Sequence, residues 1–591
     1  MRLNQVTVER ALIAGIFLLA VCIRLSYLGA APLSDAEASW ALQSLDLARG
    51  AAVEIGPQVS YVNLTGAVLY LFSSSDFTAR IWPAITGSLL VLAPLLFRRA
   101  LGRNATLILM VGLALDPGLV ATSRLAGGPM MALGFALLTL GFVYTRRSIL
   151  AGICAGLALL SGSGIIAGLV SLLLAWSLER LITGKSVPEG GQAPDEGTPP
   201  TWLAGREWVS MLISAAVTLL VVGTLLMLNP QGLAAWIASL PAYLQGWGQA
   251  SNVPPLRLAA ALLVYQPLAM IFGTIGAVRG WLRGDRLART LSLWFLVAFA
   301  LILVYPARQV FDLVWVLPPL WALAAIELAH DIRVDSSSRL VAAGEAAAVF
   351  LLLAVVWMNL TGARMAVIST ESYLLRAGVL MGLLALGAVI TLLVGLGWSW
   401  TAARAGLVWG VCAALGLYGI SAMWSASFRS EPEQIDLWQP APITRNADLF
   451  MKTVEDLSEW NTGLIREIDV TLAAEAPSLR WALRNYPELT TIPEGNVSAL
   501  PNTPSIVIAR QTAETPRLAE TYRGQDFAWW VYPGWEGALP PDFLRWLTTR
   551  QAPLRQEQVL LWARSDLFPG GESILDTVPV EIPALEAEDQ E

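Results

Sequence analysis

Residues 11–40 read ALIAGIFLLAVCIRLSYLGAAPLSDAEASW, an apolar run that is followed at once by an acidic motif. A membrane-spanning helix needs about 20 predominantly apolar residues, within a range of roughly 17–25. The 18 residues from Ala11 to Leu28 meet this requirement. The run is long for the core of a signal peptide and contains Arg24, so we interpret it as an uncleaved membrane anchor.

The composition extends this interpretation to most of the chain. Of the 591 residues, 55% are hydrophobic and only 14% are charged, whereas charged residues make up about 25% of a soluble domain. Residues 431–591 contain 26 acidic and 12 basic side chains, against 19 acidic and 26 basic ones before them. A basic apolar part and an acidic second part indicate two regions in different solvents, and the acidic part argues against a nucleic-acid partner.

Hydropathy predicts a polytopic α-helical membrane protein with about 13 transmembrane helices. The predicted spans are residues 11–28, 80–97, 105–121, 129–145, 149–162, 164–181, 208–228, 257–278, 290–304, 311–328, 340–360, 374–396 and 406–424. The apolar stretch at residues 61–72 has only 12 residues, so we expect it to lie in the membrane interface instead of crossing.

The Lys and Arg residues predict the orientation, because they are enriched in cytosolic loops. With the N-terminus in the cytosol, 17 of them fall on the cytosolic side and seven at the outer side. Thirteen spans then place the acidic second region outside. We therefore expect an integral plasma-membrane protein with an extracytoplasmic C-terminal domain.

The chain is expected to contain two domains. Residues 1–425 form the transmembrane domain, with residues 29–79 as the first outer loop and the Gly- and Pro-rich residues 183–205 as a cytosolic linker. Residues 430–580 form a soluble α/β domain, and residues 581–591 an acidic, disordered tail. In the soluble domain, strands are predicted at residues 468–473, 505–509, 527–532 and 558–563, and helices at 478–486 and 542–550.

The acidic motif predicts a helix that begins near Ser34. Ser34 is a good N-cap, and Glu37 stands three residues later, where a capping-box partner belongs. Asp35 and Glu37 are two residues apart and do not share a helix face, so at most one of them points into a given site. Both carboxylates are equally compatible with a structural role in the first turn, where acidic side chains stabilise the positive end of the helix dipole.

Several classes of site are excluded. The three cysteines, Cys22, Cys154 and Cys412, lie in apolar runs, which excludes a disulfide framework and a Cys-based zinc site. The single histidine, His330, excludes a Ser-His-Asp triad and a multi-histidine metal site. No cofactor is indicated, although Asp35, Glu37 and Asp116 leave a divalent-cation site open.

The order of motifs resembles the GT-C membrane glycosyltransferases, in the branch of the protein O-mannosyltransferases and aminoarabinose transferases. One long span and an acidic motif that opens a large outer loop carry the resemblance. The other matching pieces are Arg24, residues 75–84 (SDFTARIWPA), 98–102 (RRALG), 115–117 (LDP), 123–124 (SR), and Arg308 before 316–319 (VLPP).

The resemblance implies an inverting transfer of a sugar from a polyprenyl-phosphate donor to a glycan, lipid or protein acceptor on the outer face, as in protein glycosylation or cell-envelope assembly. The acid of the first outer loop is the family's general base, and this position corresponds to Asp35. The family commonly has adjacent Asp and Glu there, whereas this chain has Asp-Ala-Glu, so Glu37 is the second candidate.

Arginines at the expected outer ends of the spans are candidates to bind the donor phosphate, because Arg best stabilises a phosphate leaving group. These are Arg80, Arg124, Arg308 and the deeper Arg24, and Asp116 is a candidate acid that pairs with one of them. Each arginine could instead anchor its helix at the lipid headgroups. Trp40 and Trp82 either stack on the sugar or belong to an aromatic belt.

Two other functions stay open. A non-catalytic GT-C relative would serve as a scaffold or accessory subunit in cell-envelope glycan assembly. A lipid or glycan transporter is the third alternative, although no polar row through the spans and no inverted repeat of hydropathy support it.

Overall fold

The computed structural model describes residues 8–51, 53–183, 205–251, 253–331, 338–362, 370–428, 434–439, 442–493, 503–511 and 520–568. Residues 184–204 of the predicted linker and the predicted tail 581–591 lie outside these ranges. The chain forms two compact units, which we call the membrane unit (residues 1–31, 37–441 and 533–554) and the soluble unit (32–36, 442–532 and 555–591). Residues 32–36 thus belong with the soluble unit, an exchange of segments that nothing in the sequence indicated.

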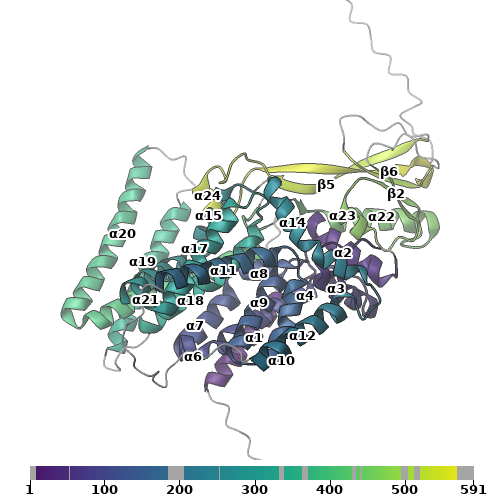
Figure 1. Ribbon diagram of the computed structural model, residues 1–591. Helices are drawn as coiled ribbons and strands as arrows, with labels where there is room; N and C mark the ends of the chain where they lie inside the picture. Colours follow the sequence, from purple (N-terminus) through teal and green to yellow (C-terminus); the bar gives the residue numbers. More distant parts are fainter. Residues whose placement is uncertain are drawn as a thin grey trace, which may run out of the picture. The chain divides into compact units, whose positions relative to one another are not determined.

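The membrane unit is helical, and its helices run from purple to green in Figure 1. Its first half contains α1 (Val8–Leu25), α2 (Asp35–Ala48), α3 (Val59–Leu71), α4 (Asp76–Leu90), α5 (Ala93–Leu96), α6 (Arg98–Leu101), α7 (Arg103–Leu115), α8 (Pro117–Ser123), α9 (Pro129–Tyr144), α10 (Ser148–Leu159), α11 (Gly164–Thr183) and α12 (Gly205–Gly223). Its second half contains α13 (Gln231–Ile237), α14 (Ser239–Gln245), η1 (Gly246–Gly248), α15 (Pro255–Tyr265), α16 (Pro267–Arg283), α17 (Arg286–Val304), η2 (Val310–Trp315), α18 (Leu317–Asp331), α19 (Arg339–Gly362), α20 (Thr370–Gly397), α21 (Trp400–Phe428) and α24 (Phe543–Thr549).

Within the described residues, eight helices are long and apolar enough to cross a membrane, or ten if each of two bent helix pairs is one span. The bends are 55° between α7 and α8 and 93° between α15 and α16. All ten coincide with predicted spans, so the polytopic architecture is confirmed. The predicted count of about 13 is not confirmed, because α9 and α10 have only 16 and 12 residues and α1 contains three charged side chains.

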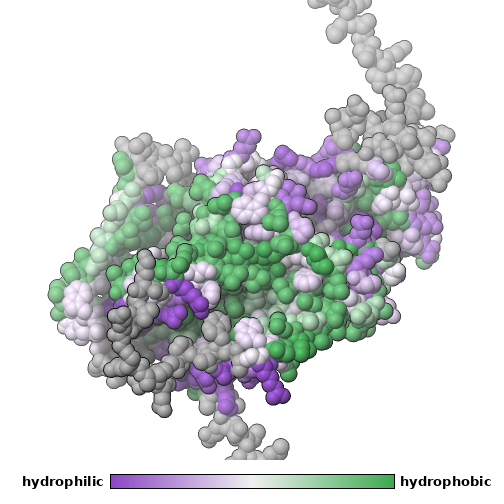
Figure 2. Space-filling model, in the orientation of Figure 1, coloured by the Kyte–Doolittle hydropathy of each residue, from purple (hydrophilic) through white to green (hydrophobic). Residues whose placement is uncertain are grey.

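Apolar side chains cover much of the outer surface of these helices, as the green areas of Figure 2 show. In α12 and in α20, only 6% of the most apolar stretch of 18 residues is buried inside the protein. Soluble monomers rarely expose apolar patches larger than a few hundred Å². These surfaces face lipid, and the protein is an integral membrane protein.

The short helix α3 covers the stretch for which we expect an interfacial position. Its 13 residues extend over about 20 Å at 1.5 Å per residue, which is too short for a hydrocarbon core of about 30 Å. Polar side chains attach it to its neighbours: Tyr61 donates to the carbonyl of Ala79 at 2.7 Å, and Asn63 donates to the carbonyl of Val222 at 2.7 Å.

The soluble unit contains a mixed six-stranded sheet in the order β1-β5-β6-β4-β2-β3. Strand β2 pairs in parallel with β3 and β4, whereas β1–β5 and β4–β6 are antiparallel. Phe450 of α22 and Trp529 of β5 are both 0% exposed in its core. The elements are β1 (Ile443–Thr444), α22 (Ala447–Thr462), β2 (Val470–Ala473), α23 (Pro477–Ala482), β3 (Leu489–Thr491), β4 (Ile506–Arg510), β5 (Tyr522–Pro533), β6 (Leu554–Arg564) and η4 (Ser565–Leu567).

The predicted α/β class of this domain is confirmed. The four predicted strands correspond to β2, β4, β5 and β6, and the two predicted helices to α23 and α24. Helix α24 lies in the membrane unit, and α22 was not predicted, because its hydrophobic periodicity lies within a strongly charged segment.

Candidate active site

The acid that the resemblance identifies as the general base, Asp35, begins α2 and belongs to the soluble unit. Its Oδ1 atom accepts hydrogen bonds from the backbone N–H of Ser478 at 3.0 Å and from the Ser478 hydroxyl at 2.5 Å. Its Oδ2 atom accepts one from the Trp530 indole N–H at 2.7 Å. These bonds hold the carboxylate in one orientation. Neither Ser478 nor Trp530 is among the site residues predicted from the sequence.

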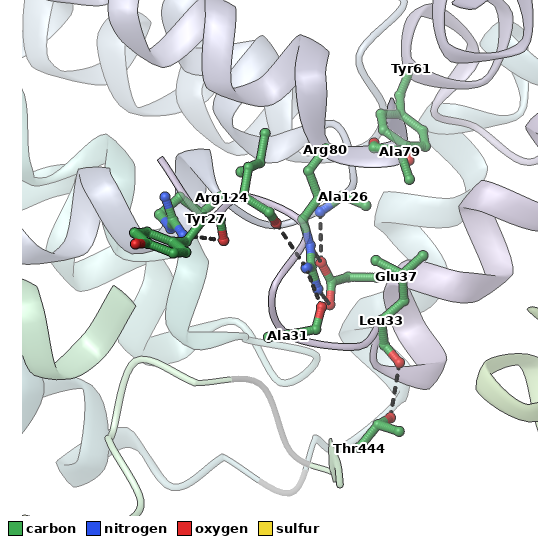
Figure 3. Close-up of polar contacts among 11 residues, drawn as sticks. Tyr27, Ala31, Leu33, Glu37, Tyr61, Ala79, Arg80, Arg124, Ala126 and Thr444 are labelled. Carbon is green, nitrogen blue, oxygen red and sulfur yellow. Dashed lines mark hydrogen bonds and ion pairs between the residues drawn. The ribbon is translucent and has the colours of Figure 1, made fainter. Parts of the chain in front are cut away.

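The second acid, Glu37, forms a buried ion pair with Arg80 inside the membrane unit (Figure 3). Arg80 donates to the two carboxylate oxygens through Nε at 2.8 Å and Nη2 at 3.0 Å, and the side chains are only 5% and 6% exposed. Oε1 of Glu37 also accepts from the backbone N–H of Ala126 at 2.9 Å. The same guanidinium donates to the carbonyl of Ala31 at 2.6 Å. Arg80, a predicted phosphate ligand, therefore ties α2 and α4 to the chain that follows α1.

Arg124 and Arg24 both donate to backbone carbonyls at helix ends, Arg124 at the end of α1 and Arg24 at the end of α7. Arg124, at the end of α8, donates to the carbonyl groups at the end of α1, which are those of Ile23, Arg24, Ser26 and Tyr27. Arg24, within α1, donates to the carbonyls of Leu113 and Ala114 at the end of α7, at 3.0 and 3.2 Å. The last carbonyls of a helix have no partner inside it, and both arginines donate to carbonyls of this kind.

Asp116 stands at the bend between α7 and α8. Its carboxylate caps α8 by accepting from the backbone N–H of Leu119 at 2.8 Å, and it accepts from the Trp321 indole at 2.7 Å. A Cβ atom on Gly112 would lie 2.4 Å from the Trp321 ring, so the glycine makes room for this indole. Asp116 is 0% exposed and holds the bend together with α18.

Arg308 differs from the other three predicted arginines. Among the described residues its guanidinium has no protein partner, and its Nε is buried. Its loop is held in place, because Tyr305 donates to the carbonyl of Tyr243 at 3.1 Å and the two rings stack with centroids 4.9 Å apart. Burial raises the pKa of Tyr305 to about 12, so its hydroxyl stays neutral. A fixed loop thus presents an arginine with unused donors.

The two predicted sugar-stacking residues take different positions. The ring of Trp40 packs against the backbone at Gly56, where an added Cβ would lie 2.5 Å from it. The indole N–H of Trp82 is buried and has no hydrogen-bond partner within the described part of the chain. Trp40 is therefore used in packing, whereas Trp82 keeps a free donor.

The membrane unit also contains an apolar cavity of about 570 Å³, lined by residues of α1, α7, α16, α18 and α21. Tyr265 and Gln266 are among its few polar lining residues, and no Lys or Arg of the described segments lines it. Such a lining suits a hydrocarbon chain and does not suit a phosphate. In the ranges that the structure describes, no three His, Cys, Asp or Glu side chains lie close enough together to hold a metal ion.

The structure therefore brings some predicted residues together and leaves others apart. Glu37 and Arg80 pair around the α1–α2 connection, and Arg124 and Arg24 share the end of α1. Asp35 is held inside the soluble unit, and Arg308 lies in the loop before η2. Asp35 Oδ2 in the soluble unit and Arg308 in the membrane unit each keep unused hydrogen-bonding capacity among the described residues.

Comparison with known proteins gives a family match for part of the chain. Residues 55–239 match the model of the family described as dolichyl-phosphate-mannose-protein mannosyltransferase. A search of curated proteins finds no match.

Solved structures show a wider similarity. The apo crystal structure of ArnT from Cupriavidus metallidurans is 15% identical with a TM-score of 0.51, and the similarity covers 93% of this chain and 97% of that one. ArnT from the same organism bound to undecaprenyl phosphate is 14% identical with a TM-score of 0.49, over 96% and 99% of the two chains. The Archaeoglobus fulgidus oligosaccharyltransferase, tethered to an acceptor peptide, is 13% identical with a TM-score of 0.38, over 85% and 69%. The similarity to apo ArnT confirms the predicted fold, and the family match over residues 55–239 supports the predicted resemblance to the GT-C glycosyltransferases.

Proposed function

We propose that the protein is an inverting glycosyltransferase that moves a sugar from a polyprenyl-phosphate donor to an acceptor at the extracytoplasmic face. The description of the matched family names a donor of this kind, dolichyl-phosphate mannose. The structural observation that carries the proposal is Arg308, whose guanidinium lacks a protein partner in the described chain although its Nε is buried. Arg308 is half-buried, and a guanidinium with unused donors is suited to bind a phosphate.

Two roles are proposed separately, each for one group within one unit. The Asp35 carboxylate removes the proton of the acceptor hydroxyl as the new glycosidic bond forms. The bond between the anomeric carbon and the phosphate oxygen breaks, and its electron pair leaves with the lipid phosphate. Arg308 stabilises the charge that develops on this leaving group. Arg80, Arg124 and Arg24 act indirectly, because Arg80 is paired with Glu37 and the other two donate to carbonyls at helix ends.

Arg308→Ala is expected to lower kcat/KM for polyprenyl-phosphate mannose by about 10²-fold, the lower end of the range for removing one donor to a developing negative charge. Arg308→Lys should retain part of the activity, because it keeps the charge and loses the planar fork. The assay is the release of polyprenyl phosphate from this donor by the full chain in lipid nanodiscs. Arg283→Ala, at an exposed position, is the control with unchanged activity. An unchanged kcat/KM in Arg308→Ala would remove Arg308 from the phosphate site.

The orientation belongs to the same proposal. The Lys and Arg distribution supports an orientation with the N-terminus in the cytosol and the soluble unit outside, in the compartment where a flipped lipid-linked sugar is exposed. The acceptor class stays open among glycan, lipid and protein.

A second candidate function is a non-catalytic scaffold for glycan assembly. The observation that favours it is that both acids of the first outer loop already have protein partners, three hydrogen bonds on Asp35 and a bidentate arginine on Glu37. A scaffold would co-purify with another envelope protein and turn over no lipid-linked sugar. Release of polyprenyl phosphate by the purified chain alone excludes it.

A further inference from the structure

The two oxygens of the Asp35 carboxylate are used unequally. Oδ1 accepts two hydrogen bonds, both from Ser478, whereas Oδ2 accepts one, from Trp530. An ionised carboxylate offers about four acceptor positions, two on each oxygen. Oδ1 is therefore filled, and Oδ2 keeps one position for another donor.

The hydroxyl of Ser478 has a fixed orientation. The indole of Trp529 donates to Ser478 Oγ at 2.9 Å, and an indole N–H can only donate. The hydroxyl hydrogen of Ser478 must therefore point to Asp35. Trp529 is 0% exposed in the core of the soluble unit. Its rigid side chain therefore fixes the hydrogen bonds from Trp529 to Ser478 and from Ser478 to Asp35.

The donor to the second oxygen is equally well supported. Trp530 is 3% exposed on β5, and the guanidinium of Arg510 lies over its ring, 4.8 Å from the centroid. Thr444 is the β1 partner of Trp530 and donates to the carbonyl of Leu33 at 2.9 Å (Figure 3). The segment that carries Asp35 is thus attached to the soluble unit both at its backbone and at its carboxylate.

We propose that Ser478 and Trp530 are positioning residues for sugar transfer. They hold Oδ1 of Asp35 and aim the free acceptor position of Oδ2, and Oδ2 is the atom that takes the proton of the acceptor hydroxyl. This inference rests on the proposed function and deepens it, because it assigns the positioning of the general base to the soluble unit. A misplacement of about 1 Å in a reacting group can cost 10²-fold in rate, so a base on a loop needs such support.

The test uses steady-state kinetics of the full chain in nanodiscs with polyprenyl-phosphate mannose. Ser478→Ala and Trp530→Phe should each lower kcat by roughly 10- to 100-fold and leave KM for this donor unchanged, because neither residue binds the donor. Ser478→Thr keeps the hydroxyl and should restore most of kcat. Melting temperatures close to that of the wild type show that the variants are folded, and Trp530→Phe serves if Ser478→Ala does not fold.

A second comparison separates this inference from the proposed function. In an Asp35→Asn background, Ser478→Ala should cause no further loss of the residual rate, because Ser478 acts through Asp35. An active wild type with an inactive Asp35→Asn variant and a fully active Ser478→Ala variant would overturn the positioning role and keep the proposed function. A raised kcat in Ser478→Ala would overturn the role as well, since it would make the contact inhibitory. A wild type that releases no polyprenyl phosphate would overturn both.

Discussion

Asp35→Asn is expected to lower kcat for sugar transfer by about 10²- to 10⁴-fold, the usual contribution of a positioned general base. Asparagine has nearly the same shape, but its amide cannot take the acceptor's proton. It also offers an N–H₂ group where the Trp530 indole needs an acceptor. The measurement is the release of polyprenyl phosphate from polyprenyl-phosphate mannose by the reconstituted full chain.

Asp46→Asn is the matched control, because it makes the same change on the same helix, α2. It should retain wild-type activity. Donor binding should survive in Asp35→Asn, so the KM for the donor is expected to change little. Full activity of Asp35→Asn would show that another group is the base, and Glu37 would then be the remaining acid of the motif.

Glu37→Gln is expected to destabilise the membrane unit by about 3–5 kcal/mol, the typical cost of removing one partner of a buried ion pair. Arg80 would keep its charge at 5% side-chain exposure and would lose its bidentate carboxylate partner. The same substitution weakens the acceptor that the backbone N–H of Ala126 uses. Thermal unfolding in detergent, followed as loss of monodisperse protein, measures the effect as a large fall in Tm.

Two further variants define this result. Arg80→Met in the Glu37→Gln background should recover part of the lost stability, because it removes the unpaired charge. Asp566→Asn breaks an ion pair in which Asp566 is 59% exposed and should cost less than about 1 kcal/mol. If Glu37→Gln melts like the wild type, the buried pair does not hold α2 to α4.

Apolar runs and local periodicity predicted much of the fold, because each span and strand carries its own signal. The helix count could not be obtained in this way. Each bend lies at a proline that begins the second helix, Pro117 in α8 and Pro267 in α16. A proline at this position is a signal that hydropathy averages away. Short helices such as α10 are buried by neighbouring helices. A local stretch of sequence carries no information about these neighbours.

The candidate site was less predictable. An arginine near a helix end can bind a lipid phosphate or a carbonyl, and the sequence does not distinguish the two. Arg124 reaches Ser26, 98 residues away, and Asp35 reaches Trp530, 495 residues away. Such partners depend on tertiary structure alone. That Arg308 has no partner among the residues that the structure describes likewise became visible only when its neighbours were known.

The central claim is that the base and the soluble unit that holds it face the extracytoplasmic side. In a chain whose native cysteines are replaced, cysteine at position 460, where the Trp460 side chain is 68% exposed in the soluble unit, can be labelled with a membrane-impermeant maleimide in intact cells. Cysteine at position 283, the site of an exposed arginine of the membrane unit, serves as the cytosolic reference. The account predicts labelling at position 460 without permeabilisation and at position 283 only after it. Labelling at position 460 only after permeabilisation would contradict the account.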